Sequence, residues 1–130
     1  MKRFLVIVAA VLSSVLVARG QACTAPDICG VWLGQEKTSK IDIYRKGNLW
    51  EGKAVWYDEY GDIGDQNVIV LRDLSYDAKE NEWTGKIYDP FRKKSFNVTV
   101  SLQRNGKLKV VGRAGVISKT MYWTKTDLQG

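Results

Sequence analysis

The sequence predicts an all-β protein, a single antiparallel up-and-down barrel of about eight strands, preceded by a secretory signal peptide. Apolar and polar residues alternate in most segments after residue 30, as they do in strands with one buried face. Gly, Asn and Asp mark short connections, and no amphipathic helical period follows the N-terminal run. These observations favour a closed barrel. An open sandwich stays an alternative, because periodicity alone does not show closure.

The N-terminus has the order of a secretory signal peptide. Lys2 and Arg3 precede an apolar run over residues 4–17, and small residues follow up to Ala22. The run is shorter than the roughly 20 residues that a membrane-spanning helix needs, so we expect no transmembrane span in the mature chain. We expect cleavage after Ala22, although a cut after Gly20 also fits the pattern.

Cleavage would leave one domain in an exported protein, periplasmic or secreted. Residues 1–22 form the expected signal peptide, and residues 23–130 are enough for one β-barrel with a modest core. Loss of the leader lowers the formal net charge from +6 to +3. The remaining Lys and Arg residues are interspersed with acids instead of forming one stripe. A nucleic-acid partner is therefore not expected.

The two cysteines, Cys23 and Cys29, lie at the start of the expected mature chain. In an oxidising compartment this pair predicts a local disulfide that pins the N-terminal segment. A lipid-bearing Cys23 is the alternative, but Gly20-Gln21-Ala22 lacks the aliphatic residue expected before such a cysteine. Because the chain has no histidine and two thiols make half of a zinc site, we expect no metal and no cofactor.

The expected strands follow one another at short intervals. Gly47-Asn48, Asp89-Pro90, Asn105-Gly106 and Ala114-Gly115 provide turns between them. The acidic stretch 58–66 interrupts the pattern, and we interpret it as a solvated loop because its spacing does not match a calcium-binding loop. The strands are expected near residues 30–36, 40–46, 49–57, 67–74, 83–88, 95–102, 107–112 and 117–125.

Four tryptophans fall on the expected inner faces of these strands. In the segment 49–57, two of them alternate with Gly52 and Ala54, which suggests interleaved large and small side chains. They either line a pocket for an apolar or sugar-like ligand or fill the barrel, since an eight-stranded barrel is about wide enough for either. We expect a mostly filled core. The four candidates for ligand binding are Trp50, Trp56, Trp83 and Trp123.

The sequence offers little for catalysis, and we expect no enzyme. Without histidine there is no Ser-His-Asp or Cys-His arrangement. Carboxylate pairs remain available from Asp62, Asp65 and Asp89, but their spacing gives no reason to bring them together. Asp89 is better explained as a turn residue whose side chain binds nearby backbone before Pro90.

A basic cluster, Arg92, Lys93 and Lys94, stands at the expected tip of the hairpin that spans residues 83–102. It is either a solvated turn or a contact for anionic envelope material such as lipid headgroups. Folding alone does not require these three charges.

Several spaced residues resemble the bacterial domain-of-unknown-function family 2147. The most specific part is the block Trp83-Thr84-Gly85-Lys86-Ile87-Tyr88-Asp89-Pro90, and weaker matches run from Gly30 to Trp123. The resemblance implies a small exported protein of Gram-negative bacteria with a lipocalin-like barrel and no established activity. The chain departs from the family pattern after Pro90, where Phe91-Arg92-Lys93-Lys94 replaces the usual Gly-Lys.

Gly30-Val31-Trp32 also resembles the Gly-x-Trp signature of lipocalins. That resemblance implies that Trp32 packs near the closed end of the barrel against a basic side chain from the last strands. Arg113 and Lys125 are the candidates for a cation-π contact with it.

Two hypotheses for function remain open after these observations. The first is a non-catalytic binding module that takes a small apolar or amphipathic ligand at an open barrel end. The second is an interaction or structural protein of the cell envelope, with a filled barrel and an outer surface that includes Arg92 to Lys94. An internal void large enough for several heavy atoms would favour the first.

Overall fold

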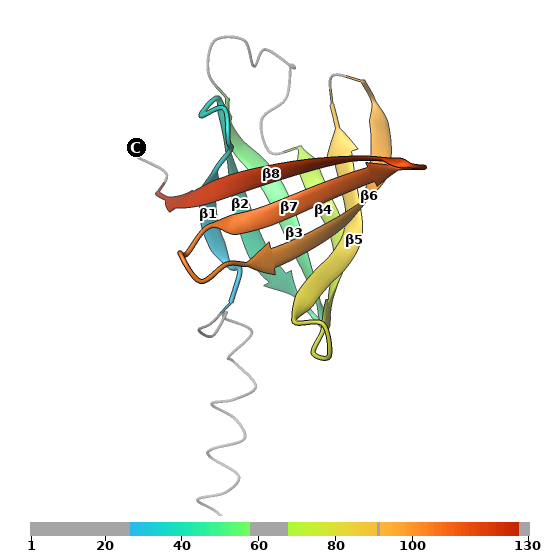
Figure 1. Ribbon diagram of the computed structural model, residues 1–130. Helices are drawn as coiled ribbons and strands as arrows, with labels where there is room; N and C mark the ends of the chain where they lie inside the picture. The colour runs from blue at the N-terminus through green and yellow to red at the C-terminus, as the bar shows by residue number, and fades with distance from the viewer. Residues whose placement is uncertain (1–26, 58–67, 91, 128–130) are drawn as a thin grey trace, which may run out of the picture.

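The computed structural model describes residues 27–57, 68–90 and 92–127, which form a closed antiparallel barrel (Figure 1). The strands are β1 (Gly30–Leu33), β2 (Ser39–Lys46), β3 (Leu49–Tyr57), β4 (Ile69–Asp77), β5 (Glu82–Asp89), β6 (Lys94–Leu102), β7 (Leu108–Ala114) and β8 (Ile117–Thr126). Each strand pairs with the next, and β1 pairs with β8. The predicted barrel is confirmed and the open sandwich is wrong. The expected signal peptide and the acidic stretch 58–66 lie outside the described residues.

The hairpin of β5 and β6 is paired without a register shift, as its alternating sequence predicts. Trp83 faces Val100 across the pair, and both side chains are buried. At the turn, the Asp89 carbonyl accepts a hydrogen bond from the Lys93 amide at 2.7 Å, and the Asp89 carboxylate accepts one from the Arg92 amide at 3.3 Å. The predicted role of Asp89 as a turn residue is confirmed.

One end of the barrel, which we call the closed end, is filled by side chains. It carries the β2–β3, β4–β5 and β6–β7 connections (Figure 1). Trp50 and Trp83 pack edge to face there, with ring centroids 5.7 Å apart. Their cross-strand partners Leu74 and Val100 are fully buried. Edge-to-face aromatic packing adds to the free energy gained by burying the two rings.

A bulge in β4 explains the glycine of the Trp-x-Gly block. β4 has one residue more than β5 between Arg72 and Ser75, and Asp73 takes a left-handed conformation with φ of 54°. The bulge brings the β4 backbone over Gly85, where an added Cβ would lie 2.5 Å from the Arg72 carbonyl oxygen. A residue with a side chain cannot be placed there without moving the backbone.

The barrel closes where β1 and β8 meet, along the pairs Val31–Thr126, Trp32–Lys125 and Leu33–Thr124. The Lys125 ammonium lies 4.9 Å from the centroid of the buried Trp32 ring and donates a hydrogen bond to the Cys29 carbonyl at 2.7 Å. The predicted cation-π contact on Trp32 is therefore confirmed, with Lys125 as the cation. Arg113, the other candidate, donates a hydrogen bond to the Thr99 hydroxyl instead, at 3.1 Å.

Gly30 leaves the space that this contact needs. A Cβ at Gly30 would lie 2.7 Å from the Lys125 Cε, and the residue has a φ of 128°. The Trp32 indole nitrogen in turn donates a hydrogen bond to the Ile28 carbonyl at 2.8 Å. The Gly-x-Trp sequence thus fixes both the entry of the chain into β1 and the closure of the barrel.

Two further predictions from the sequence concern the disulfide and membrane-spanning segments. Cys29 is half-buried and packs against the core, but Cys23 lies outside the described residues, so their pairing stays a prediction. Within residues 27–57, 68–90 and 92–127, no helix is long and apolar enough to cross a membrane.

Replacement of Trp83 by alanine is expected to lower the free energy of unfolding by about 3–5 kcal/mol, because it leaves a cavity against Trp50 in the closed end. Equilibrium urea unfolding followed by far-UV circular dichroism measures the loss. Tyr122, which is 41% exposed, is the matched aromatic control, and Tyr122→Ala should cost less than about 1 kcal/mol. A similarly small loss for Trp83→Ala would contradict the core placement.

Lys125→Met should lower the free energy of unfolding by about 1–2 kcal/mol, since it removes an exposed cation-π contact and a charge-assisted hydrogen bond at the closure. Lys125→Arg keeps a cation over Trp32 and should lose less than half as much. Urea unfolding of the two variants side by side tests this. Equal stabilities would show that the cation does not contribute to closure.

Candidate functional site

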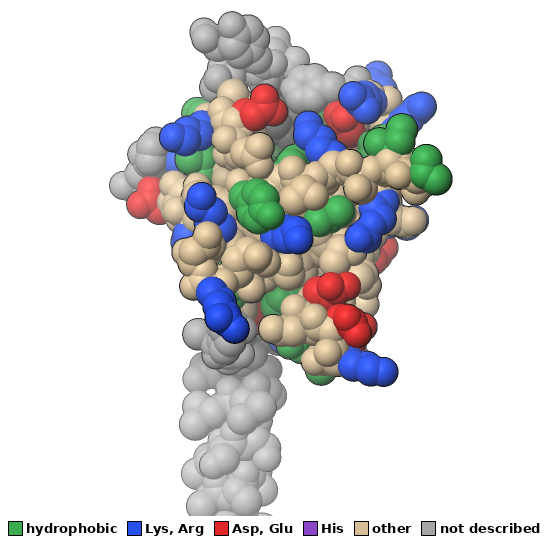
Figure 2. Space-filling model, viewed as in Figure 1, with side chains coloured by type: hydrophobic (Ala, Val, Ile, Leu, Met, Phe, Trp, Pro, Cys, Tyr) green, Lys and Arg blue, Asp and Glu red, His purple; other side chains and the backbone are tan. Residues whose placement is uncertain are grey.

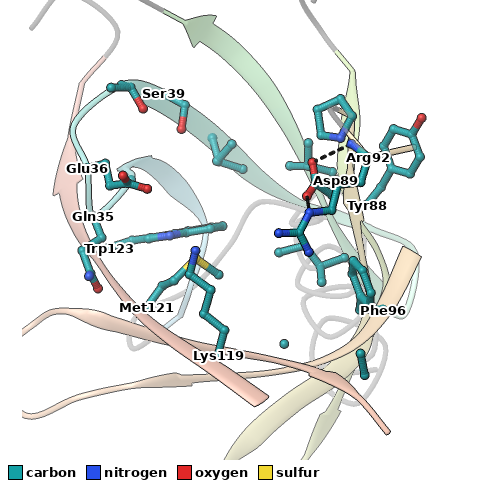
Figure 3. Close-up of a pocket in the computed structure, with 18 of the residues that line it drawn as sticks. Gln35, Glu36, Ser39, Tyr88, Asp89, Arg92, Phe96, Lys119, Met121 and Trp123 are labelled. Atoms are coloured by element: carbon teal, nitrogen blue, oxygen red, sulfur yellow. Dashed lines mark hydrogen bonds and ion pairs between the residues drawn. The ribbon is translucent and has the colours of Figure 1, made fainter. Parts of the chain in front are cut away.

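A cavity of about 460 Å³ opens at the other end of the barrel, which we call the open end. The open end carries the β1–β2, β5–β6 and β7–β8 connections, and residues in or directly beside each of them line the cavity (Figure 3). The volume falls within the range of roughly 300–1,000 Å³ that is typical of small-molecule sites. The interpretation of a mostly filled core therefore holds for the closed end and is wrong for the open end.

Apolar side chains from several strands form the inner wall of this cavity. Gly112 adds space to it, since a Cβ placed there would meet only Ile87, at 3.8 Å. In Figure 3 the Trp123 ring reaches into the cavity from β8, next to the thioether of Met121. Such a wall favours the apolar part of a ligand. The apolar residues of the inner wall include Ile41, Val70, Ile87, Phe96, Met121 and Trp123.

Polar and charged side chains line the mouth of the cavity. Arg92 forms an ion pair with Asp89, its Nε lying 3.7 Å from the carboxylate, and both residues face the cavity. Glu36 and Ser39 come from the β1–β2 side of the mouth (Figure 3). The mouth thus offers hydrogen-bonding groups of both charges above an apolar interior.

Lys119 is a basic side chain on the inner face of the barrel. It pairs with Gly112 across β7 and β8 and stands two residues before Met121 in the inward phase of β8. Figure 3 shows its side chain running toward Met121 and Trp123, with Arg92 across the cavity. Among the described residues, the Lys119 ammonium has no hydrogen bond or ion pair. It is therefore available to an anionic group inside the mouth.

All four tryptophans proposed for ligand binding lie in the described part of the chain, and Trp123 is the one that lines the cavity. Trp50 and Trp83 pack against each other in the closed end. Trp56 lies on the outer face, because β3 has an extra residue between Ala54 and Trp56. The bulge pairs Trp56 with Lys40, whose ammonium lies 5.5 Å from the Trp56 ring centroid. The strict alternation expected through Trp56 is thus wrong.

The sequence did not predict a functional role for Lys119. The alternation of β8 contains the signal, because Lys119 has the same phase as Met121 and Trp123. The basic cluster divides in two: Arg92 lines the cavity mouth, whereas Lys93 and Lys94 are exposed beside it.

The titration shifts in this barrel belong to the outer face of β2 and β3. Burial raises the pKa of Asp42 even though Lys53 acts to lower it. Burial and a hydrogen bond to Glu51 raise the pKa of Tyr44. Within the described residues, no group of three His, Cys, Asp or Glu side chains is placed to hold a metal ion.

Comparison with known proteins identifies the family. A family model described as "Uncharacterized protein conserved in bacteria (DUF2147)" matches residues 30–125. The chain belongs to this family. The match confirms the resemblance carried by the Trp83 to Pro90 block, and no curated protein sequence matches the chain.

The DUF2147 barrel is also similar to a solved structure, protein HP1028 from the human pathogen Helicobacter pylori, described as belonging to the lipocalin family. The TM-score is 0.65 at 18% sequence identity, over 79% of this chain and 85% of that chain. At this identity the likeness concerns the fold alone. It confirms the predicted lipocalin-like barrel.

Proposed function

We propose that the DUF2147 barrel is a non-catalytic binding module that holds one small amphipathic ligand in the open-end cavity. The observation that carries this proposal is a cavity of about 460 Å³ with an apolar wall and a charged mouth. An apolar ligand part gains free energy by leaving water, and the polar groups at the mouth fix its orientation. Trp123 is the one tryptophan that this proposal retains as a contact.

The polar end of the ligand is expected to be anionic. Lys119 faces inward without a hydrogen bond or ion pair among the described residues, whereas Asp89 is engaged by Arg92. A carboxylate, sulfonate or phosphate inside the mouth would therefore meet an available ammonium. Glu36 lies on the opposite side of the mouth and would oppose an anion there.

The proposal includes export and the absence of catalysis. The signal peptide pattern of residues 1–22 supports a periplasmic or secreted protein, and the Cys23–Cys29 disulfide is expected in that compartment. The chain has no histidine, and Asp89 is engaged in its turn. No cofactor is required for a binding module of this kind.

The alternative hypothesis, an envelope interaction protein with a filled barrel, is less well supported for the interior. A contact between the outer surface and an envelope component is compatible with both hypotheses, because a barrel that binds a ligand can also make such a contact. Occupancy of the cavity distinguishes the two hypotheses for the interior.

Gly112→Leu is expected to abolish or weaken at least tenfold the binding of N-phenyl-1-naphthylamine, a neutral fluorescent probe, because the new side chain fills the cavity from its wall. Probe fluorescence during titration measures the affinity. Thr120→Leu adds the same side chain to an exposed position that does not line the cavity, and should leave binding unchanged. Equal binding by both variants would place the probe elsewhere and refute the cavity as the site.

Lys119→Gln should weaken the binding of 8-anilinonaphthalene-1-sulfonate by roughly tenfold, the value of one charge-assisted contact. The neutral N-phenyl-1-naphthylamine has nearly the same ring system without the sulfonate, so its affinity should stay within about twofold. Glu36→Gln removes the opposing charge and should strengthen binding of the sulfonate. An equal loss of affinity for both probes would show that Lys119 contributes to the shape of the cavity and not through its charge.

A further inference from the structure

The β7–β8 hairpin presents unusually exposed apolar side chains at its tip. Val116 is fully exposed and Ile117 is 71% exposed. Figure 2 shows hydrophobic side chains at the outer end of this hairpin, with Lys and Arg side chains close by. Exposed aliphatic side chains gain free energy when they leave water, so this tip can insert into an apolar environment.

Basic side chains surround this tip. Lys93 and Lys94 are exposed in and beside the β5–β6 turn, and Arg113 is exposed on β7. Among the described residues, no ion pair involves any of these three cations. Their charge is therefore open to an external anionic partner.

The apolar tip and the basic turn lie at the same end of the barrel. Ile117 of the hairpin and Arg92 of the β5–β6 turn line the mouth of one cavity. The Asn97–Arg113 pair of β6 and β7 brings the start of β6 alongside the β7–β8 turn. Both turns therefore face the same side, which we call the β5–β8 rim.

The two described acids that line the cavity, Asp89 and Glu36, are placed less favourably for opposing this charge. Asp89 is engaged by Arg92, and Glu36 belongs to the β1–β2 side. The acidic segment 58–66 lies outside the described residues. The described residues of the β5–β8 rim therefore carry a net positive charge.

We propose that the β5–β8 rim docks the barrel, mouth toward the surface, on an anionic lipid bilayer. Val116 and Ile117 enter the boundary between headgroups and acyl chains, while Lys93, Lys94 and Arg113 contact lipid phosphates. An apolar tip gives weak membrane binding alone, and a polybasic patch supplies the second attraction that stable binding needs.

A lipid surface fits this rim better than a folded protein does. Two aliphatic side chains are a small apolar patch, whereas a stable protein interface buries roughly 800 Å² on each partner around a larger apolar centre. Mobile headgroups can gather around dispersed cations without a complementary shape. The proposal does not depend on cavity occupancy, since neither Val116 nor the two lysines line the cavity.

Cosedimentation with vesicles tests the proposal. The full mature chain is mixed with phosphatidylcholine vesicles that contain 30% phosphatidylglycerol, and with vesicles of phosphatidylcholine alone. We expect binding to the anionic vesicles, at least tenfold weaker binding to the neutral ones, and weakening by salt. Lack of binding to the anionic vesicles would overturn the proposal and leave a protein partner for this rim.

Matched variants locate the docking surface. Lys93→Gln with Lys94→Gln should weaken partitioning to anionic vesicles by at least about tenfold, and Val116→Ser by about threefold to fivefold. Lys79→Gln with Lys107→Gln removes the same charge at the closed end, where both residues are exposed, and should change it less than twofold. Equal losses for the two double variants would show unspecific charge attraction and overturn the docking geometry. Binding of N-phenyl-1-naphthylamine by every variant reports separately on the cavity.

Discussion

The barrel depends on the contact that closes it. β1 has four residues and pairs with β8 at three positions, so backbone hydrogen bonding there is short compared with the other hairpins. Side chains complete the closure: Trp32 fills the space beneath β1, and Lys125 covers its ring and binds the Cys29 carbonyl. Without this contact, backbone pairing at three positions would be the main link between β1 and β8. Because Gly30 has no side chain, Lys125 can lie over Trp32 at this short closure.

The closed barrel has a filled end and an open end, because the large inward side chains are concentrated at one end of the strands. In the closed end, Trp50 and Trp83 meet in the space between the sheet walls. Toward the open end, the inward positions of β7 carry Gly112 and Ala114, so the wall there is thin. The cavity follows from this change in side-chain size along one barrel, and needs no change in strand number or tilt.

The sequence predicted the eight strands because each has one buried face, and alternation records burial directly. The prediction was wrong for Trp56. One extra residue in β3 turns the side chains that follow it to the opposite face of the barrel, and the apolar pattern of the sequence does not reveal it. The bulge at Asp73 was invisible for the same reason, although Gly85 marks its position on the neighbouring strand. The sequence left a ligand pocket and a filled barrel as alternatives, because alternation says which residues point inward but not whether inward side chains meet. Lys119 is in phase with Met121 and Trp123 in the strand expected at 117–125, but alternation alone assigns no function to an inward lysine.

The asymmetry between the two ends bears on how a ligand would reach the cavity. A barrel filled at its closed end admits a molecule only through the mouth, where the β5–β6 and β7–β8 turns stand. The apolar tip and the exposed lysines belong to those same turns. A barrel docked through this rim would therefore face its entrance toward the acyl chains, and an amphipathic molecule could pass between bilayer and cavity with less apolar surface exposed to water. Lys119, just inside the mouth, would then be among the first charges that its anionic end meets.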